Sequence, residues 1–298
     1  MNRVRLVFVS LLAVALVPAS VCHAFEFDFH GSLGEGRFRR YVPPVTNPLL
    51  NETPYITTEI RPIYLHNDIP NNFLTSGGKI DLGAVELRLA LTERLGFIAS
   101  KDGYAGIDFG RVLEDEEGFA NISFGFKYAV LSRPEKEAIV TVGVEYEPPT
   151  GNLKTSGISL QGEGDGLIDL FVSAAKAYDK LGFQASMGFN VAIDGDHDSS
   201  QFHYSLHVDY EALPKFYPLI EFNGFTTIDH GNRTPGDFEG IDLVNFGSTD
   251  SGTVVTFGVG ARYRLSDHLL LGAAYETPLT DREDIMNWRV YVDAVITF

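Results

Sequence analysis

The fold class is decided by the last residues of the chain, Trp288-Arg-Val-Tyr-Val-Asp-Ala-Val-Ile-Thr-Phe298. Every second residue of this stretch is apolar: Trp288, Val290, Val292, Ala294, Ile296 and Phe298. The residues between them are mostly polar. Because successive side chains of a β-strand point to opposite faces, this alternation predicts a strand with one apolar face and one polar face.

The same alternation recurs in twelve runs and predicts an all-β protein. The expected runs are 54–65, 79–91, 94–109, 119–130, 137–147, 166–178, 181–193, 201–211, 216–227, 252–265, 268–278 and 286–298. Most of them contain about 10–13 residues, which is close to what a tilted strand needs to cross a bilayer and longer than the roughly 5–6 residues of a soluble strand. Two runs break the alternation: a bulge is expected around 83–85, and residues 100–103 are expected either to form a kink or to lie at the rim.

The connectors between the runs alternate in length. Short connectors are expected at 92–93, 132–136, 179–180, 213–215 and 266–267. Long connectors are expected at 66–78, 110–118, 148–165, 194–200, 228–251 and 279–285. A membrane barrel has tight periplasmic turns on one rim and longer extracellular loops on the other, whereas a soluble β-sandwich has no such sorting. The pattern favours a transmembrane antiparallel β-barrel of about 12 strands over residues 54–298, with a soluble periplasmic sandwich as the alternative.

The first residues have the layout of a secretory signal peptide. Arg3 and Arg5 precede an apolar run at 6–17, and small residues follow. We expect residues 1–24 to be cleaved, which also removes Cys22, the only cysteine. The mature chain then has no thiol, so we expect neither a disulfide framework nor a cysteine-based zinc site.

Residues 25–53 form an N-terminal segment ahead of the first expected strand. Prolines interrupt the segment, and it carries the cations Arg37, Arg39 and Arg40. These cations favour a plug inside the barrel, where carboxylates of the wall can pair with them. A periplasmic position and a disordered lead-in are the alternatives.

The net charge and the positions of the aromatic residues limit which partners the protein can have. The chain has 40 Asp and Glu against 23 Lys and Arg, a formal net charge of −17, so nucleic acid is not expected to bind. Tyr and Phe recur near the ends of the runs, as in the aromatic girdles of membrane barrels, so the expected partners are outer-membrane lipid and lipopolysaccharide. The terminal Phe298 resembles the signal by which outer-membrane proteins reach the barrel-assembly machinery.

Several stretches carry a resemblance to a known family. They are 51–55 and 57–64 (NETPY and TTEIRPIY), 94–99 (RLGFIA), 118–122 (GFANI), 260–265 (GARYRL) and 275–280 (YETPLT). The chain resembles a family of uncharacterised bacterial outer-membrane barrel proteins over most of its length. More loosely, it is similar to barrel transporters of the meta-pathway phenol-degradation type. The resemblance implies the architecture and a cell outer membrane location, and transfers no activity.

The polar residues at alternate positions of the runs are expected to line the lumen. The candidate lumen-lining residues are Glu59, Arg61, Glu86, Arg88, Lys127, Glu145, His203, His207, Asp209, Glu221, Arg262, Arg264, Glu276, Arg289 and Asp293. Both charge signs are present, and a twelve-stranded barrel lies between the filled eight-stranded and the open sixteen-stranded cases. Two interpretations stay open: a narrow conducting pore, or a lumen closed by ion pairs between its own residues.

Other polar clusters carry weaker signals. Asp194, Asp196 and His197 share an expected extracellular loop, and Asp229 begins the next long one, so a hydrolytic site at the extracellular rim is an alternative. Residues 194–198 also resemble the opening of a calcium loop, but the bidentate Glu at its twelfth position is missing. His203 and His207 would lie about 13 Å apart along one strand, too far to share a metal. No metal and no cofactor are expected.

The sequence therefore predicts a passive outer-membrane channel or transporter for a small solute, not an enzyme. The alternatives are an outer-membrane hydrolase with an Asp/His site at the extracellular rim and a closed structural barrel.

Overall fold

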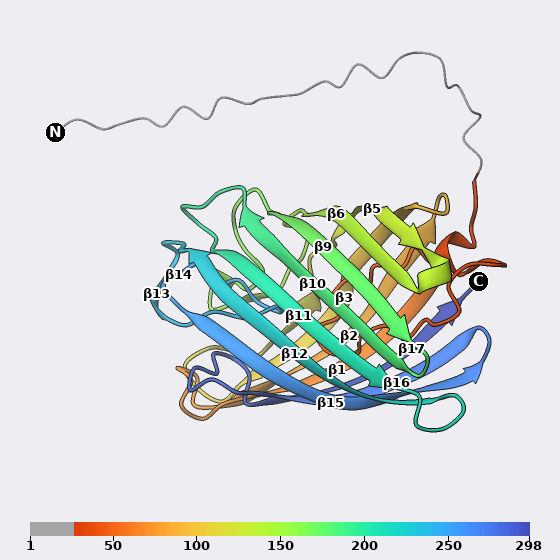
Figure 1. The fold of residues 1–298 in the computed structure, drawn as a ribbon. Helices are drawn as coiled ribbons and strands as arrows, with labels where there is room; N and C mark the ends of the chain where they lie inside the picture. The colour runs from red at the N-terminus through yellow and green to blue at the C-terminus, as the bar shows by residue number, and fades with distance from the viewer. Residues whose placement is uncertain (1–26) are drawn as a thin grey trace, which may run out of the picture.

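The computed structural model describes residues 27–298, except for the side chain of Asp102, and shows a closed antiparallel β-barrel (Figure 1). The expected signal peptide lies outside the described residues. The twelve barrel strands are β1 (Glu59–Ile69), β2 (Gly78–Ala90), β3 (Leu95–Phe109), β5 (Phe124–Arg133), β6 (Ala138–Glu147), β9 (Leu167–Tyr178), β10 (Leu181–Ala192), β11 (Ser200–Tyr210), β12 (Phe216–Asp229), β15 (Thr253–Ser266), β16 (Leu269–Pro278) and β17 (Trp288–Thr297).

Each barrel strand pairs with its neighbours in sequence, and the first pairs with the last. The seam between β1 and β17 runs from the Glu59–Thr297 pair to the Asp68–Trp288 pair. The sheet therefore has no free edge, which a backbone surrounded by lipid requires. The expected all-β fold and its twelve-stranded barrel are confirmed.

The short elements lie at the rims. The 3₁₀-helices η1 (Gly31–Leu33) and η2 (Pro134–Lys136) lie near the short turns, whereas the pairs β7 (Lys154–Thr155) with β8 (Ile158–Ser159) and β13 (Thr234–Asp237) with β14 (Ser248–Asp250) belong to the long loops. Short turns and long loops alternate around the barrel, as expected. We call the end formed by 91–94, 133–137, 179–180, 211–215 and 267–268 the short-turn rim, and the other end the long-loop rim.

The expected runs 54–65 and 119–130 differ most from the strands observed. β1 begins at Glu59 rather than at residue 54, because the Thr141 hydroxyl donates to the Pro54 carbonyl inside the barrel (2.6 Å), which keeps that residue out of the sheet. The expected run 119–130 is divided into β4 (Glu116–Phe119) and β5, and residues 120–123 lie between them.

The expected bulge lies in β2, opposite the part of β3 where a kink was expected. The register of β2 against β3 shifts between Val85 and Leu87. β3 stays continuous through residues 100–103, where backbone bonds to the interrupted partner link Ser100 with Ser123 (3.1 Å) and Ala120 with Gly103 (2.9 Å).

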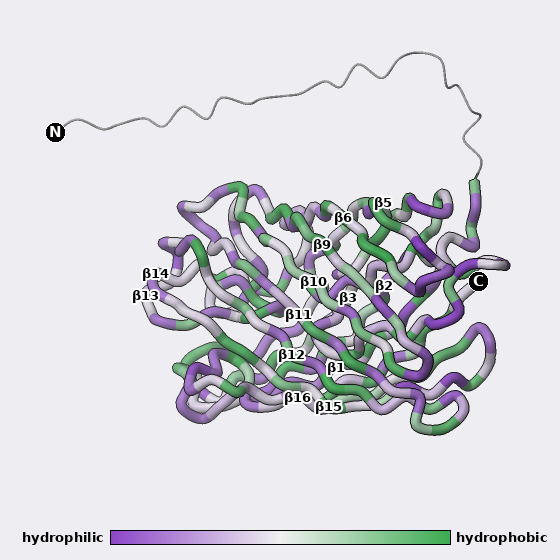
Figure 2. The backbone as a smooth tube through the Cα atoms, in the orientation of Figure 1, coloured by the Kyte–Doolittle hydropathy of each residue, from purple (hydrophilic) through white to green (hydrophobic). Residues whose placement is uncertain are grey.

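The distribution of side chains is the reverse of that in a soluble protein. Large apolar side chains on the outer face are exposed, for example Phe126, Leu206 and Val292, while charged side chains on the same strands are buried inside. Figure 2 shows the apolar and polar colours alternating along the strands. This arrangement suits a lipid surround and a polar interior. Within residues 27–298, no helix has the length and apolar character needed to cross a bilayer.

Candidate functional site

The lumen is filled from both ends by the chain itself. Residues 41–56, which we call the lumen segment, enter from the short-turn rim, contain neither helix nor strand, and are buried at every position. From the long-loop rim, the loop between β12 and β15 turns inward. Its Leu243 and Val244 belong to the same apolar cluster as Val45 and Leu49 of the lumen segment. The interior is therefore a packed core that contains an irregular coil and a folded loop, both inside the barrel wall.

Glycines in the wall make room for the lumen segment. A Cβ atom at Gly258 of β15 would lie 2.7 Å from the Thr46 Cγ2 atom, closer than real Cβ contacts allow. At Gly96 of β3, a Cβ atom would lie 3.3 Å from the Ile56 Cγ2 atom, a tight contact. The wall is thus shaped to the path of the segment at two positions.

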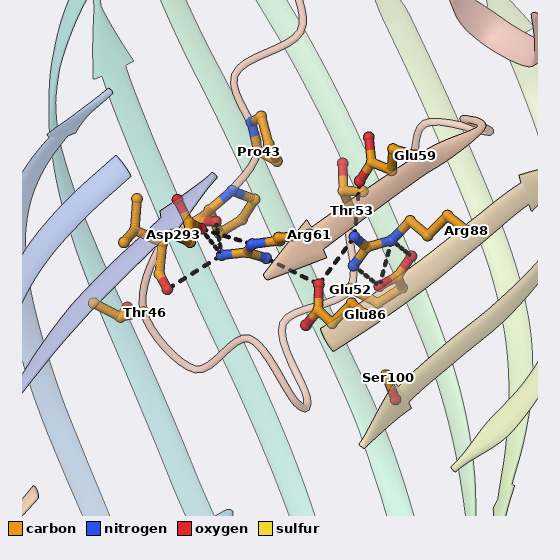
Figure 3. A network of polar contacts seen from close by, with 12 residues as sticks. Pro43, Thr46, Glu52, Thr53, Glu59, Arg61, Glu86, Arg88, Ser100 and Asp293 are labelled. Atoms are coloured by element: carbon orange, nitrogen blue, oxygen red, sulfur yellow. Dashed lines mark hydrogen bonds and ion pairs between the residues drawn. The ribbon is translucent and has the colours of Figure 1, made fainter. Parts of the chain in front are cut away.

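An arginine of β1 connects the wall to the lumen segment. The Arg61 Nε atom donates to Asp293 of β17 (2.6 Å), and its Nη1 atom donates to Glu86 of β2 (3.3 Å). Its Nη2 atom donates to the Pro44 carbonyl oxygen of the segment (2.9 Å). Arg262 of β15 binds the same two partners, with 2.8 Å between its Nη2 atom and Asp293 and 2.6 Å to the Pro44 oxygen. Figure 3 shows the Arg61 guanidinium between Asp293 and Glu86.

A second group binds a carboxylate of the lumen segment. Glu52 receives hydrogen bonds from Arg88 of β2, at 2.9 Å from Nε and 2.5 Å from Nη2, and from the Lys127 Nζ atom of β5 at 2.5 Å. Arg88 also donates to Glu59 (2.8 Å) and to Glu86 (3.0 Å), so a single guanidinium joins three carboxylates (Figure 3). Paired arginine donors of this kind fix both position and orientation of a carboxylate.

On the opposite wall, a carboxylate of β12 receives backbone groups of the segment. Glu221 accepts hydrogen bonds from the amides of Val45 (2.9 Å) and Thr46 (2.6 Å). The His207 Nδ1 atom lies 2.6 Å from the Glu221 Oε1 atom, and its Nε2 atom lies 3.2 Å from Asp209. The wall therefore holds main-chain atoms of the segment as well as its side chains.

The inward loop has its own ion pair with the wall. The Arg289 Nη1 atom of β17 lies 2.8 Å from the Asp242 carboxylate of that loop. Nearby, Glu276 accepts a hydrogen bond from the Asn223 amide (2.6 Å) and one from the Tyr291 hydroxyl, both wall residues. The pair between Arg289 and Asp242 is completely buried, so the loop is fixed inside the barrel.

Three further expected lining residues make separate contacts. Glu145 accepts hydrogen bonds from the hydroxyls of Ser100 (2.5 Å) and Ser123 (2.9 Å). The His203 Nε2 atom lies 2.8 Å from Asp169. The Arg264 Nη2 atom donates to the Tyr41 carbonyl oxygen of the segment (2.7 Å).

The structure places fourteen of the fifteen candidate lining residues in buried positions, and Arg264 in a half-buried one. It joins most of them in networks, and it gives His203 and His207 different partners. Sequence reasoning assigned no role to Glu52 or Asp242. An isolated acid within a proline-interrupted segment, and an acid flanked by apolar residues at 241–244 of a long polar loop, are the signals that point to them.

The arginine cluster before the lumen segment has mixed partners. Arg40 pairs with Asp209 of the barrel wall. Arg37 instead pairs with Asp28 of its own segment, and the Arg39 backbone amide donates to Glu137 (3.2 Å). Partial burial acts to raise the pKa of Asp28, but the hydrogen bond and charge of Arg37 hold that pKa below its usual value.

The acidic loops at the long-loop rim are held by structural contacts. Asp198 is buried and accepts the amides of Glu163 (3.1 Å) and Gly164 (2.9 Å), so it ties two loops together. Asp194 lies 2.9 Å from the His197 Nδ1 atom at an exposed position. Across residues 27–298, no group of three or more His, Cys, Asp or Glu side chains is arranged to hold a metal ion.

Little empty space remains in the filled lumen. The apolar cavity between the segment and the inward loop has a volume of about 20 Å³ and is bordered by Leu49, Leu82, Lys101 and Leu243. A second cavity, of about 10 Å³, lies beside Glu145. Such volumes hold about one water molecule each. In this conformation the lumen is closed, and passage of a solute requires the contents to move.

Comparisons with known proteins agree with the fold. The sequence model of a family described as putative MetA-pathway of phenol degradation matches residues 61–284. An outer membrane channel from Pseudomonas putida F1 is 16% identical, with 87% of this chain and 100% of that chain covered and a TM-score of 0.59. The NanC porin is 8% identical, with 81% of this chain and 99% of that chain covered and a TM-score of 0.48. No curated protein sequence matches the chain.

Proposed function

This chain belongs to the family described as putative MetA-pathway of phenol degradation, and we propose from that premise that it is a passive outer-membrane channel for a small solute. The lumen segment closes the channel, and the solute passes when the segment withdraws toward the short-turn rim. The short-turn rim faces the periplasm and the long-loop rim faces outward, as in other membrane barrels.

One observation carries this proposal. The space inside the closed wall is filled by a coil that is separate from the sheet and is bound to charged side chains of the wall by hydrogen bonds and ion pairs. Removing this coil leaves all strand pairings intact, because residues 41–56 belong to no strand. The charged groups of the wall can also bind water and solute once the coil has left.

The contacts of the acidic residues in the long loops favour a channel over a hydrolase. The side chain of Asp198, which belongs to the acidic rim cluster, is committed to two backbone amides. Catalytic carboxylates need a free face toward substrate and a base at hydrogen-bond distance. The outer membrane channel from Pseudomonas putida F1 shares the fold of this chain.

The test is a reversible tether between segment and wall, Thr46→Cys with Gly258→Cys. A Cβ atom at position 258 would lie 2.7 Å from one γ atom of Thr46 and 3.4 Å from the other. A disulfide needs about 3 Å between the sulfur of one cysteine and the Cβ atom of its partner, as follows from an S–S bond of about 2.05 Å. The expected signal peptide carries the only natural cysteine, Cys22, so the tether is the one thiol pair of the mature chain.

In planar bilayers, we expect the oxidised tether variant to remain closed and its conductance to appear on reduction. Gly258→Cys alone, measured under both conditions, controls for the substitution. Equal conductance of the oxidised and reduced forms would show that the lumen segment is not the gate. Absence of conductance from the wild type and from the reduced variant at every voltage would refute the channel and favour the closed structural barrel.

A further inference from the structure

The barrel interior contains a carboxylate-binding site that is occupied by a side chain of the protein itself. Glu52 is held by three nitrogen atoms of the wall, Nε and Nη2 of Arg88 and Nζ of Lys127, at 2.5 to 2.9 Å. The Glu52 side chain is only 6% exposed. A guanidinium fork and an ammonium group in a buried position form a specific receptor for a carboxylate.

Withdrawal of the lumen segment would leave this receptor short of negative charge. The Lys127 ammonium donates both of its hydrogen bonds to the segment, one to the Glu52 carboxylate and one to the Thr53 carbonyl oxygen (2.8 Å). Arg88 keeps Glu59 and Glu86 on the wall. A cation in a secluded site without a partner is strongly unfavourable. An anion that takes the place of Glu52 would therefore favour the open state.

An apolar surface lies next to this receptor. Leu49, three residues before Glu52, borders the apolar cavity together with Leu82, Ala84 and Leu243. Lys101 lies at the edge of the same cavity. Three residues of extended chain span at most about 10 Å, so the apolar surface and the cationic site lie within the length of one small molecule. In the closed state, the segment places the apolar side chain of Leu49 and the carboxylate of Glu52 in these two neighbouring positions.

We propose that the solute of this channel is a small monocarboxylate with an apolar body, which displaces Leu49 and Glu52 and binds to Arg88 and Lys127. The proposal rests on the channel function proposed above and names the class of its solute. The apolar body occupies the surface that Leu49 covers, and the carboxylate occupies the position of the Glu52 carboxylate. The lumen segment is then a competitor built into the chain.

The test uses hexanoate as probe, with hexanamide to remove the charge and acetate to remove the apolar body. Binding to the purified full chain in detergent is measured by calorimetry. Glu52→Gln removes the competing charge but keeps the shape of the side chain, so we expect it to bind hexanoate about tenfold more tightly than the wild type. Adding Lys127→Met to this variant is expected to abolish the gain.

Glu276→Gln is the matched control, because it removes a buried lumen carboxylate whose hydrogen bonds come from wall residues. We expect this control to bind hexanoate as the wild type does. The inference is overturned if Glu52→Gln binds hexanoate no more tightly than the wild type. It is also overturned if the substitution raises the affinity for hexanamide or acetate as much as the affinity for hexanoate.

Conductance of the same variants separates this inference from the channel proposal. If Glu52→Gln conducts but has no gain in hexanoate affinity, the solute class is wrong and the channel stands. If Glu52→Gln gains affinity but neither it nor the wild type conducts, the carboxylate site stands and the channel proposal is wrong.

Discussion

Glu221→Gln is the sharpest single perturbation of the closed state. The two oxygens of Glu221 accept the amides of Val45 and Thr46 at 2.9 and 2.6 Å, at a position that is 0% exposed. Glutamine keeps one acceptor oxygen and places an NH₂ group against the other amide, so one buried backbone donor loses its acceptor. A hydrogen bond to a charged group contributes about 1.5–3 kcal/mol. At about 1.4 kcal/mol for each factor of ten, the ratio of open to closed channels should rise about 10- to 100-fold.

The assay is the open probability of single channels in planar bilayers, with β-sheet circular dichroism as the check on folding. Glu276→Gln is again the matched control, since its partners Asn223 and Tyr291 belong to the wall. Its open probability should match that of the wild type. A folded Glu221→Gln variant with an unchanged open probability would refute the reasoning, because its amide contacts would then contribute nothing to closure. Equal increases in both variants would point to a general loosening of the wall.

Two further predictions follow from packing and from charge. Gly258→Val should push Thr46 and raise conductance, because its Cβ atom would lie 2.7 Å from the Thr46 Cγ2 atom, whereas Gly106→Val, which meets nothing within 4 Å, should not. Burial raises the pKa of Asp284 from 3.8 to about 6, although Arg282 lies beside it. Protonation therefore favours the folded loop between β16 and β17, a contribution that is complete below about pH 4 and is lost as the pH rises through about 6. Hydrogen exchange in 279–287, corrected for intrinsic rates, should show more protection at about pH 5 than at about pH 8, and Asp284→Asn should remove this difference.

The barrel could be predicted from the sequence because the requirement on its side chains repeats at every second residue. Each strand has to present apolar groups to lipid and polar groups to the lumen, so the alternation marks the strands and the loop lengths mark the rims. The same periodicity hides local interruptions. Residues 120–123 keep the alternation, but the Asn121 amide binds Glu147 (3.0 Å) and the Gln161 carbonyl oxygen (2.8 Å), and the strand is broken there.

The lumen contacts could not be read in the same way. An irregular segment has no period, so its path depends on tertiary contacts such as those of Glu52 with Arg88 and Lys127. The fifteen lining candidates followed from parity alone, but parity says nothing about which partner each of them contacts. The pairing of Arg289 with Asp242 needs a loop that turns back into the barrel, and a loop of that length has many possible courses.

The lumen segment is anchored at both ends to the same rim, by Arg40 at Asp209 before it and by the start of β1 at Glu59 after it. In the proposed gating, the segment therefore withdraws toward the short-turn rim and stays attached to the barrel through β1. A tethered group of this kind acts at an effective concentration of about millimolar, whatever the amount of protein in the membrane. Reclosure should thus be fast and self-contained, and a free solute has to reach a comparable concentration outside the cell before it keeps the passage open.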